Sequence, residues 1–173
     1  MRELADAERI RRFMRVLGHE ADQDGSAYFT GGATAVLIGW RTSTIDVDIL
    51  FVPEIDQVLR ALPRIKDELA INVELASPAD FIPVPAGWED RSVFIAQEGS
   101  LSFRHFDLHA QALAKVERAH TQDLEDVRAL LDRGLVIPER ALEYFQQIEP
   151  ELYRYPAIDP SAFQRRAEEL FAS

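Results

Sequence analysis

The sequence predicts an α+β fold, with an N-terminal core of interspersed strands and helices and a C-terminal helical part. Two observations carry this prediction. Short runs rich in apolar residues, of strand length, recur up to about residue 108, whereas helical spacing dominates from residue 110 onward. A chain of 173 residues is also long enough to bury a substantial core. We therefore expect a core over residues 1–135 and a helical extension over residues 136–173 that packs on it.

The N-terminal half contains three helical patterns and three strand patterns. Apolar residues at helical spacing predict an amphipathic first helix that ends between Asp22 and Gly25. A later helical segment contains Pro63, which should kink it or split it in two. The elements expected after the first helix are, in order, a strand over 27–30, a helix over 33–38, a strand over 46–51, a helical segment over 54–69 and a strand over 71–75.

The C-terminal half begins with a proline-rich loop, over residues 77–90, that Phe81 and Trp88 should pin in place. A hairpin follows, and the rest is helical. Thr121 is expected to cap one helix, and Asp159 followed by proline the last one. The expected elements are strands over 93–97 and 101–108 and helices over 110–118, 121–132, 138–153 and 160–171.

Composition excludes several classes of function. The formal net charge of −11 argues against a large basic surface for nucleic acid, although a local basic groove is compatible with it. The absence of cysteine excludes disulfides, thiolate catalysis and cysteine-based zinc sites. The charged first residues and the lack of any span-length apolar stretch favour a cytoplasmic protein without a membrane partner.

Asp46 and Asp48 are the first candidates for chemistry. Side chains alternate along a strand, so both carboxylates and Leu50 share one face. The opposite, apolar face is expected to carry Ile45, Val47, Ile49 and Phe51. Adjacent carboxylates repel each other and raise each other's pKa, so a fold that places them side by side normally gives them a cation to share. Magnesium is the natural candidate.

With its neighbours, this strand resembles the nucleotidyltransferase superfamily, whose mark is a Gly-Gly or Gly-Ser pair opening a helix, followed by a strand with Asp-x-Asp. Within it, the sequence is most similar to small bacterial nucleotidyltransferase-like proteins related to AbiE-type toxins. The resemblance implies a mixed β-sheet flanked by helices, and transfer of NMP from an NTP with Mg²⁺ or Mn²⁺ bound. The matching residues are Thr30-Gly31-Gly32, Arg41-Thr42-Ser43-Thr44, Asp46-Val47-Asp48, Leu113-Ala114-Lys115, Arg118, Asp123 and Asp126.

The resemblance gives catalytic and metal-binding roles to Asp46, Asp48 and a third acid on a neighbouring strand. Glu74 is the best-placed candidate, because Val73 and Leu75 would face the core and leave Glu74 toward the site. It would act as a metal ligand or as the base that activates the acceptor. The superfamily usually has aspartate here, and the alternative is a glutamate that only serves solubility.

Gly31 and Gly32 would expose backbone N–H groups to the nucleotide's phosphates, which a Cβ would block. The superfamily often has serine in place of the second glycine, so a hydroxyl contact is missing unless Thr30 or Thr34 replaces it. Arg41, with Thr44 in the following turn, would also bind the nucleotide. Arg41 has two open roles: a bidentate clamp on a phosphate, or pairing with Asp46 or another local acid to relieve carboxylate repulsion.

Lys115 would hold a phosphate of the nucleotide, with Asp123 or Asp126 orienting it. The lysine would lie within reach of the glycines and aspartates. The alternative is an exposed helix carrying ordinary salt bridges. Treated as an exposed residue, Lys115 is expected to contribute little to folding.

Two other groups favour structural roles. His105, Asp107 and His109 alternate along a probable strand, but three ligands on one strand rarely converge on an ion, so we expect strand-face polar residues, with Asp107 capping the next helix. The aromatic residues of the proline-rich loop could stack a base, but more often such residues anchor a loop to the core.

The sequence therefore predicts a metal-dependent nucleotidyltransferase whose acceptor hydroxyl belongs to RNA, a small molecule or a protein. A toxin-like component with an antitoxin partner is one form of this hypothesis. Two alternatives stay open: an aminoglycoside-type adenylyltransferase, whose cationic substrate would suit the acidic surface, and a catalytically silent binding module of the same fold.

Overall fold

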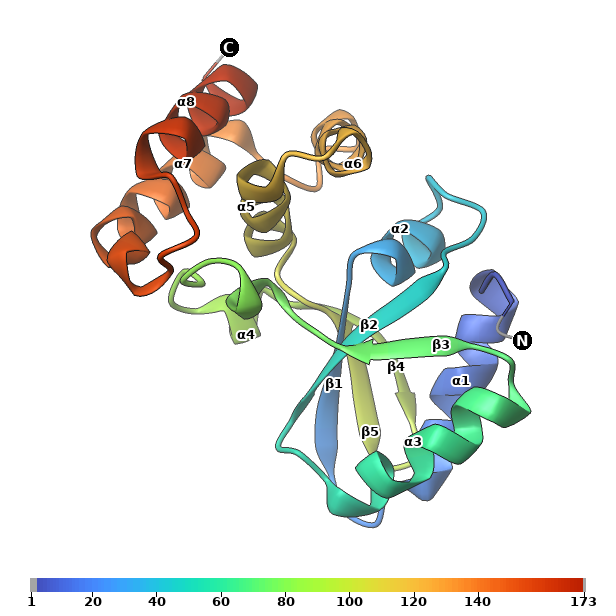
Figure 1. Ribbon diagram of the computed structural model, residues 1–173. Helices are drawn as coiled ribbons and strands as arrows, with labels where there is room; N and C mark the ends of the chain where they lie inside the picture. Colours follow the sequence, from blue (N-terminus) through green and yellow to red (C-terminus); the bar gives the residue numbers. More distant parts are fainter. Residues whose placement is uncertain (1–2, 173) are drawn as a thin grey trace. The chain divides into compact units, whose positions relative to one another are not determined.

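The computed structural model describes residues 3–172, which form two compact units. The first unit covers the chain up to Ser77 together with Val93–His105, and the second covers Pro78–Ser92 and the chain from Phe106 onward. The predicted α+β class is confirmed, with a mixed sheet flanked by helices and a helical C-terminal part (Figure 1). The domain boundary that we expect after residue 135 stays a prediction.

The first unit is a five-stranded sheet with helices. The strand order is β3-β2-β1-β5-β4, in which β1 is antiparallel to β2 and parallel to β5, β2 is parallel to β3, and β4 is antiparallel to β5. Its elements are α1 (Ala7–Glu20), β1 (Gly25–Thr30), α2 (Gly32–Ile38), β2 (Asp46–Val52), α3 (Asp56–Glu68), β3 (Asn72–Leu75), β4 (Val93–Glu98) and β5 (Leu101–His105).

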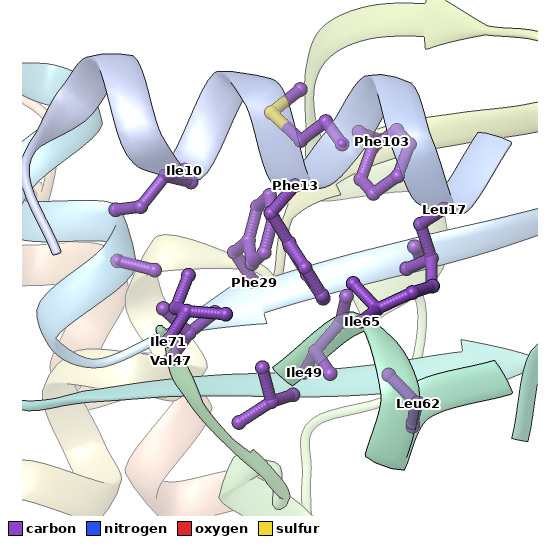
Figure 2. Close-up of a cluster of buried hydrophobic side chains, with 14 of the residues drawn as sticks. Ile10, Phe13, Leu17, Phe29, Val47, Ile49, Leu62, Ile65, Ile71 and Phe103 are labelled. Carbon is purple, nitrogen blue, oxygen red and sulfur yellow. The ribbon is translucent and has the colours of Figure 1, made fainter. Parts of the chain in front are cut away.

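The core of this unit lies between the sheet and its amphipathic helices. Asp6 caps α1 by accepting a hydrogen bond from the Arg9 N–H at 2.9 Å. Figure 2 shows apolar side chains of α1 pointing at Phe29 of β1 and Phe103 of β5. Burying each such side chain stabilises the fold by about 1.5–3 kcal/mol, so packing against these helices fixes one face of the sheet as the core face.

Three details of this unit differ from the sequence prediction. Helix α3 is not split at Pro63 but continues as a single helix, because its apolar face, including the buried Val58 and Ile65, packs on the core. Ile45 precedes β2 and is 70% exposed, whereas the alternation predicted a core position. Leu75 ends β3 and is 57% exposed, so only Val73 of that pair is buried. Strand ends fall outside the cover of the helices, and the two-residue period no longer predicts burial there.

The second unit is helical. Trp88 stacks on Phe106 with ring centroids 4.2 Å apart, and the Arg118 guanidinium lies 4.7 Å from the Phe81 ring centroid. The aromatic residues of the proline-rich loop therefore anchor it, as expected. The elements are the short 3₁₀ helix η1 (Pro78–Asp80), α4 (Trp88–Arg91), α5 (Leu108–Arg118), α6 (Thr121–Asp132), α7 (Pro138–Ile148), the 3₁₀ helix η2 (Glu149–Arg154) and α8 (Pro160–Phe171).

Of the caps predicted for α6 and α8, the one for α8 is confirmed. Asp159 caps α8 by accepting from the Ala162 N–H at 3.2 Å, as predicted. Thr121 is not the cap of α6. His120 takes that position, and the Asp123 carboxylate accepts a hydrogen bond from the His120 backbone N–H in a capping box.

Among residues 3–172, no helix combines the length and apolar character needed to cross a membrane.

Candidate functional site

Asp46 and Asp48 lie on one face of β2, as the alternation predicted. Val47 and Ile49 are fully buried in the core, so the two half-buried carboxylates point to the opposite face of the sheet. We call the face that carries Asp46 and Asp48 the site face. β3 runs parallel to β2 with Glu74 in register beside Asp48. The sheet thus brings the predicted third acid next to the pair, on an exposed strand end.

Asn72 is a neighbour of Asp46 in the same register. Its side-chain amide donates a hydrogen bond to Oδ1 of Asp46. This bond fixes the orientation of the carboxylate without adding charge. The sequence gives no sign of this role for Asn72, because only the strand register shows which acid it contacts.

The acids fit a hard cation that takes part of its coordination from a ligand. Among residues 3–172, no group of three or more histidine, aspartate or glutamate side chains is close enough to hold a metal ion alone. Mg²⁺ is commonly held by one or two carboxylates with water and substrate phosphates in the remaining positions. Asp46 and Asp48 would hold such an ion, whose charge would screen the phosphates, with Glu74 as the nearest additional oxygen donor.

The glycine turn adjoins these acids. β1 ends at Thr30, which pairs with Asp48, and Gly31 follows with φ 62° and ψ −130°. A Cβ added at Gly31 would lie 3.1 Å from Oδ2 of Asp48, and an L-residue rarely adopts this backbone conformation. Glycine at this position therefore lets the turn approach the carboxylate closely.

Gly32 has a steric reason for replacing serine. A Cβ at Gly32 would lie 2.7 Å from Cβ of Thr44 and would overlap the Thr44 hydroxyl. That hydroxyl donates to the backbone carbonyl of Asp46 at 2.9 Å. The backbone of Thr44 also pairs with Ala5. Thr44 thus occupies the space of a residue-32 side chain and links the glycine turn to the start of the acidic strand.

The other candidate hydroxyl and the nearby arginine are also located. Thr34 is 1% exposed and its hydroxyl lies 2.9 Å from Nδ1 of His105, so it is committed to the interior. Thr30 is half-buried at the end of β1 on the site face. A guanidinium nitrogen of Arg41 would lie 3.2 Å from a Cβ at Gly32. Arg41 therefore lies against the glycine turn, compatible with either role proposed for it.

Lys115 belongs to the second unit, where it is buried rather than exposed. Its side chain is 6% exposed, and its ammonium lies 2.7 Å from Oδ2 of Asp126 and 3.7 Å from Oδ1 of Asp123. Arg118 binds the same Asp123 oxygen at 2.8 Å. The expectation of an exposed lysine is wrong because α5 packs against α6, α7 and α8. Of the two aspartates, Asp126 is its closer partner, and its proximity to the first unit's acids stays a prediction.

His105, Asp107 and His109 do not share a strand face as predicted, because β5 ends at His105, Asp107 precedes α5 and His109 lies within α5. The expected helix cap at Asp107 is confirmed. Asp107 caps α5 by accepting from the His109 N–H at 3.1 Å and forms an ion pair with Arg91 at 2.9 Å. Nε2 of His109 accepts a hydrogen bond from the Ile137 N–H at 3.1 Å. Burial lowers the pKa of His109, and burial with the nearby Arg11 lowers that of His105 to about 4. Both rings are therefore neutral parts of the interior.

Arg104 is a polar residue of the site face that the sequence analysis missed. It pairs with Tyr28 across β1 and β5, and its guanidinium lies 5.5 Å from the Phe94 ring centroid. The alternation of buried Leu101, Phe103 and His105 could have placed it opposite the core. The adjacency of β5 to β1, which is a tertiary feature, was needed to bring it to the same sheet as the acids.

Comparison with known proteins identifies one family. The model of the family described as "nucleotidyltransferase of unknown function (DUF6036)" matches residues 8–149. That range includes Asp46 and Asp48, the glycine turn, and Lys115 with Asp123 and Asp126. No curated protein and no solved structure matches the chain.

Proposed function

Because the chain belongs to this family of nucleotidyltransferases, we propose that it is a metal-dependent enzyme that transfers NMP from an NTP to an acceptor hydroxyl. The observation that carries the proposal is the contact geometry of the first unit. The glycine turn approaches Oδ2 of Asp48, and Asp46 and Glu74 flank that carboxylate on the site face. The backbone proposed to bind phosphate and the oxygen atoms proposed to bind the metal are thus side by side.

In the proposed reaction, the acceptor oxygen bonds to the α-phosphorus as the bond between that phosphorus and the bridging oxygen to the β-phosphate breaks. Pyrophosphate leaves, and the acceptor hydroxyl loses its proton. Such a transfer depends mainly on positioning and charge neutralisation. Asp46 and Asp48 would hold Mg²⁺ or Mn²⁺, which supplies that neutralisation when bound. Glu74 would accept the hydroxyl proton or complete the metal site.

The remaining residues would bind the nucleotide. Backbone N–H groups of Gly31 and Gly32 would meet its phosphates, and Arg41, beside the same turn, would clamp one of them. Thr44 supports this turn from behind through its contact with Gly32. Lys115, held by Asp126, and Asp123 would contribute if the second unit presents them to the triphosphate.

The biological form that we propose is a toxin-like enzyme related to the AbiE type, with an antitoxin partner and RNA as the acceptor. A small molecule, including an aminoglycoside, and a protein hydroxyl are the other acceptors considered. A catalytically silent module is the alternative outside enzymes. It is favoured by the glycine at position 32 and the glutamate at position 74, where the superfamily often has serine and usually has aspartate.

The metal site is tested by titrating Mn²⁺ and following free Mn²⁺ by electron paramagnetic resonance. We expect binding by the wild type, and a loss of at least tenfold in affinity in Asp48→Asn and in the double variant with Asp46→Asn. Asp56→Asn, an exposed acid at the start of α3, is the matched control. Equal Mn²⁺ affinity in the double variant and the wild type would refute the assignment.

Nucleotide binding is tested by thermal unfolding with each of the four NTPs, with and without Mg²⁺. A ligand that binds the native state raises the melting temperature by mass action. We expect a rise with NTP and Mg²⁺ together and none with NTP alone, because phosphates and carboxylates repel each other without the cation. If millimolar NTP and Mg²⁺ give no rise with any base, the silent module is the better explanation.

A further inference from the structure

Four strand positions of β2 and β3 surround the proposed metal site, and they carry three acids and one amide. The register pairs Asp46 with Asn72 and Asp48 with Glu74, and alternation places all four side chains on the site face. Neighbouring strands lie about 5 Å apart, and every second residue of a strand is about 7 Å farther along. The four side chains thus form a compact rectangle in which only Asn72 is uncharged.

Asn72 is the residue that holds the Asp46 carboxylate. Its side-chain amide donates to Oδ1 of Asp46, and among residues 3–172 no other side chain donates a hydrogen bond to that carboxylate. Thr44 fixes the backbone of the same aspartate, because its hydroxyl donates to the Asp46 carbonyl at 2.9 Å. This arrangement leaves Oδ2 of Asp46 for another ligand.

The turn that leads into Asn72 is pinned from two sides, so the amide itself is held in place. Arg9 of α1 donates to the backbone carbonyls of Leu69 at 3.0 Å and Ala70 at 3.3 Å. The N–H of Ile71, a fully buried residue, donates to a carbonyl in the last turn of α3 at 3.0 Å. Partners that orient a metal ligand matter for binding, since their substitution typically lowers metal affinity by about 10–100-fold.

The amide also limits the number of carboxylates on this face. An aspartate at position 72 would have nearly the same shape as asparagine and would place a fourth acid beside Asp46. The affinity of a carboxylate site for a hard cation depends on how many charged ligands it has and on its rigidity. With the acids present, no group within residues 3–172 is close enough to hold an ion by itself. The phosphates of a nucleotide would therefore have to complete the coordination.

We propose that Asn72 is a positioning residue of the metal site and that it makes cation binding depend on the nucleotide. Asn72 orients Asp46 so that one oxygen is left for the ion. It also occupies the position where a further carboxylate would complete a site made of protein alone, so that the cation is bound tightly only together with phosphates. The inference rests on the proposed function, and it gives a role to a residue outside the motif that indicates the family.

The test is titration of Mn²⁺ without nucleotide, followed by electron paramagnetic resonance, on two variants of Asn72. Asn72→Leu keeps the branched shape but removes the hydrogen bond, and it should bind Mn²⁺ about tenfold more weakly than the wild type. Asn72→Asp exchanges the amide for a carboxylate and should bind Mn²⁺ about tenfold more tightly. Two controls should bind as the wild type does: Gln97→Glu, the same exchange at an exposed position of β4, and Val73→Ala, which weakens packing on the core side of β3.

Thermal unfolding supplies a second measurement and shows whether each variant is folded. Mn²⁺ alone should raise the melting temperature of Asn72→Asp more than that of the wild type. Each of the four NTPs, tested in turn with Mg²⁺, should raise that of Asn72→Leu less than that of the wild type. An Asn72→Asp chain that folds only when Mn²⁺ is present supports the inference, and one that stays unfolded with Mn²⁺ overturns it.

The outcomes separate this inference from the proposed function. A wild-type Mn²⁺ affinity in Asn72→Leu overturns the positioning role, and an unchanged or weaker affinity in Asn72→Asp overturns the role in nucleotide dependence. Neither result removes the metal site, which depends on the titration of Asp48→Asn. A wild type that binds neither Mn²⁺ nor NTP with Mg²⁺ removes the proposed function and the inference together.

Discussion

Replacement of Lys115 by methionine is the perturbation that the structure makes most informative. Methionine keeps most of the apolar length of lysine and removes the ammonium. Lys115 is 2.7 Å from Asp126, whose side chain is 2% exposed, so the variant removes an ammonium group from contact with a buried carboxylate. The sequence alone had suggested an exposed lysine whose loss would hardly change stability.

The expected magnitude follows from which charges lose their partner. Breaking a buried ion pair by removing one member costs about 3–5 kcal/mol, whereas an exposed pair contributes about 0–1 kcal/mol. In the variant, Asp123 still has its ion pair with Arg118 at 2.8 Å. Most of the lost stability is therefore expected to come from Asp126. We therefore expect Lys115→Met to lower the free energy of unfolding by about 3 kcal/mol, at the lower end of that range.

The assay is urea unfolding followed by tryptophan fluorescence. The chain has two tryptophans, Trp40 in the first unit and Trp88 in the second. In a Trp40→Phe background, the fluorescence of Trp88 therefore follows the unfolding of the unit that contains Lys115. At a slope of about 1–3 kcal/mol per molar urea, the loss moves the midpoint down by about 1–3 M. Arg128→Met, an exposed cation on α6, is the matched control and should change stability by less than about 0.5 kcal/mol.

A double variant separates the ion pair from packing. Lys115→Met combined with Asp126→Leu removes both charges, and it should recover much of the stability because an apolar pair of similar volume can replace a buried ion pair. A loss below about 1 kcal/mol in Lys115→Met would show that the lysine is solvated, as the sequence suggested, and would refute the argument from burial.

Two further predictions concern the first unit. Gly32→Ser should lower the melting temperature, at a cost of about 1–3 kcal/mol, because its Cβ overlaps the Thr44 hydroxyl. In a Thr44→Gly background, which lacks that hydroxyl, the same substitution should cost clearly less, and an equal cost in calorimetry would contradict the contact. His105 has a pKa of about 4 in the folded chain against 6.5 ordinarily, so the unfolded chain binds the extra proton below about pH 6.5 and stability falls from there to about pH 4. The difference between the two pKa values is worth about 3 kcal/mol of stability. His105→Gln should lose that part of the pH dependence in urea titrations between pH 7 and 4. An unchanged profile would show that a residue other than His105 causes it.

The sequence by itself determined the features that local periodicity encodes. The two-residue alternation around Asp46 and Asp48 placed both carboxylates on one face, since the pleat of a strand depends only on its own residues. The glycine pair, the hairpin near Gly99 and the cap at Asp159 were predicted for the same reason, because turns and caps are short-range structures. The motif order also indicated the nucleotidyltransferase family, which the match over residues 8–149 confirms.

Only the tertiary structure decided which residues meet across strands and helices. The burial of Lys115 depends on three helices packing around α5, and a lysine on an amphipathic segment carries no local sign of that. The overlap between Thr44 and the position of a Cβ on Gly32 depends on the path of the chain between α2 and β2. Arg104 reaches the site face because β5 pairs with β1, far from it in sequence. Such contacts arise from long-range packing, which no residue window contains.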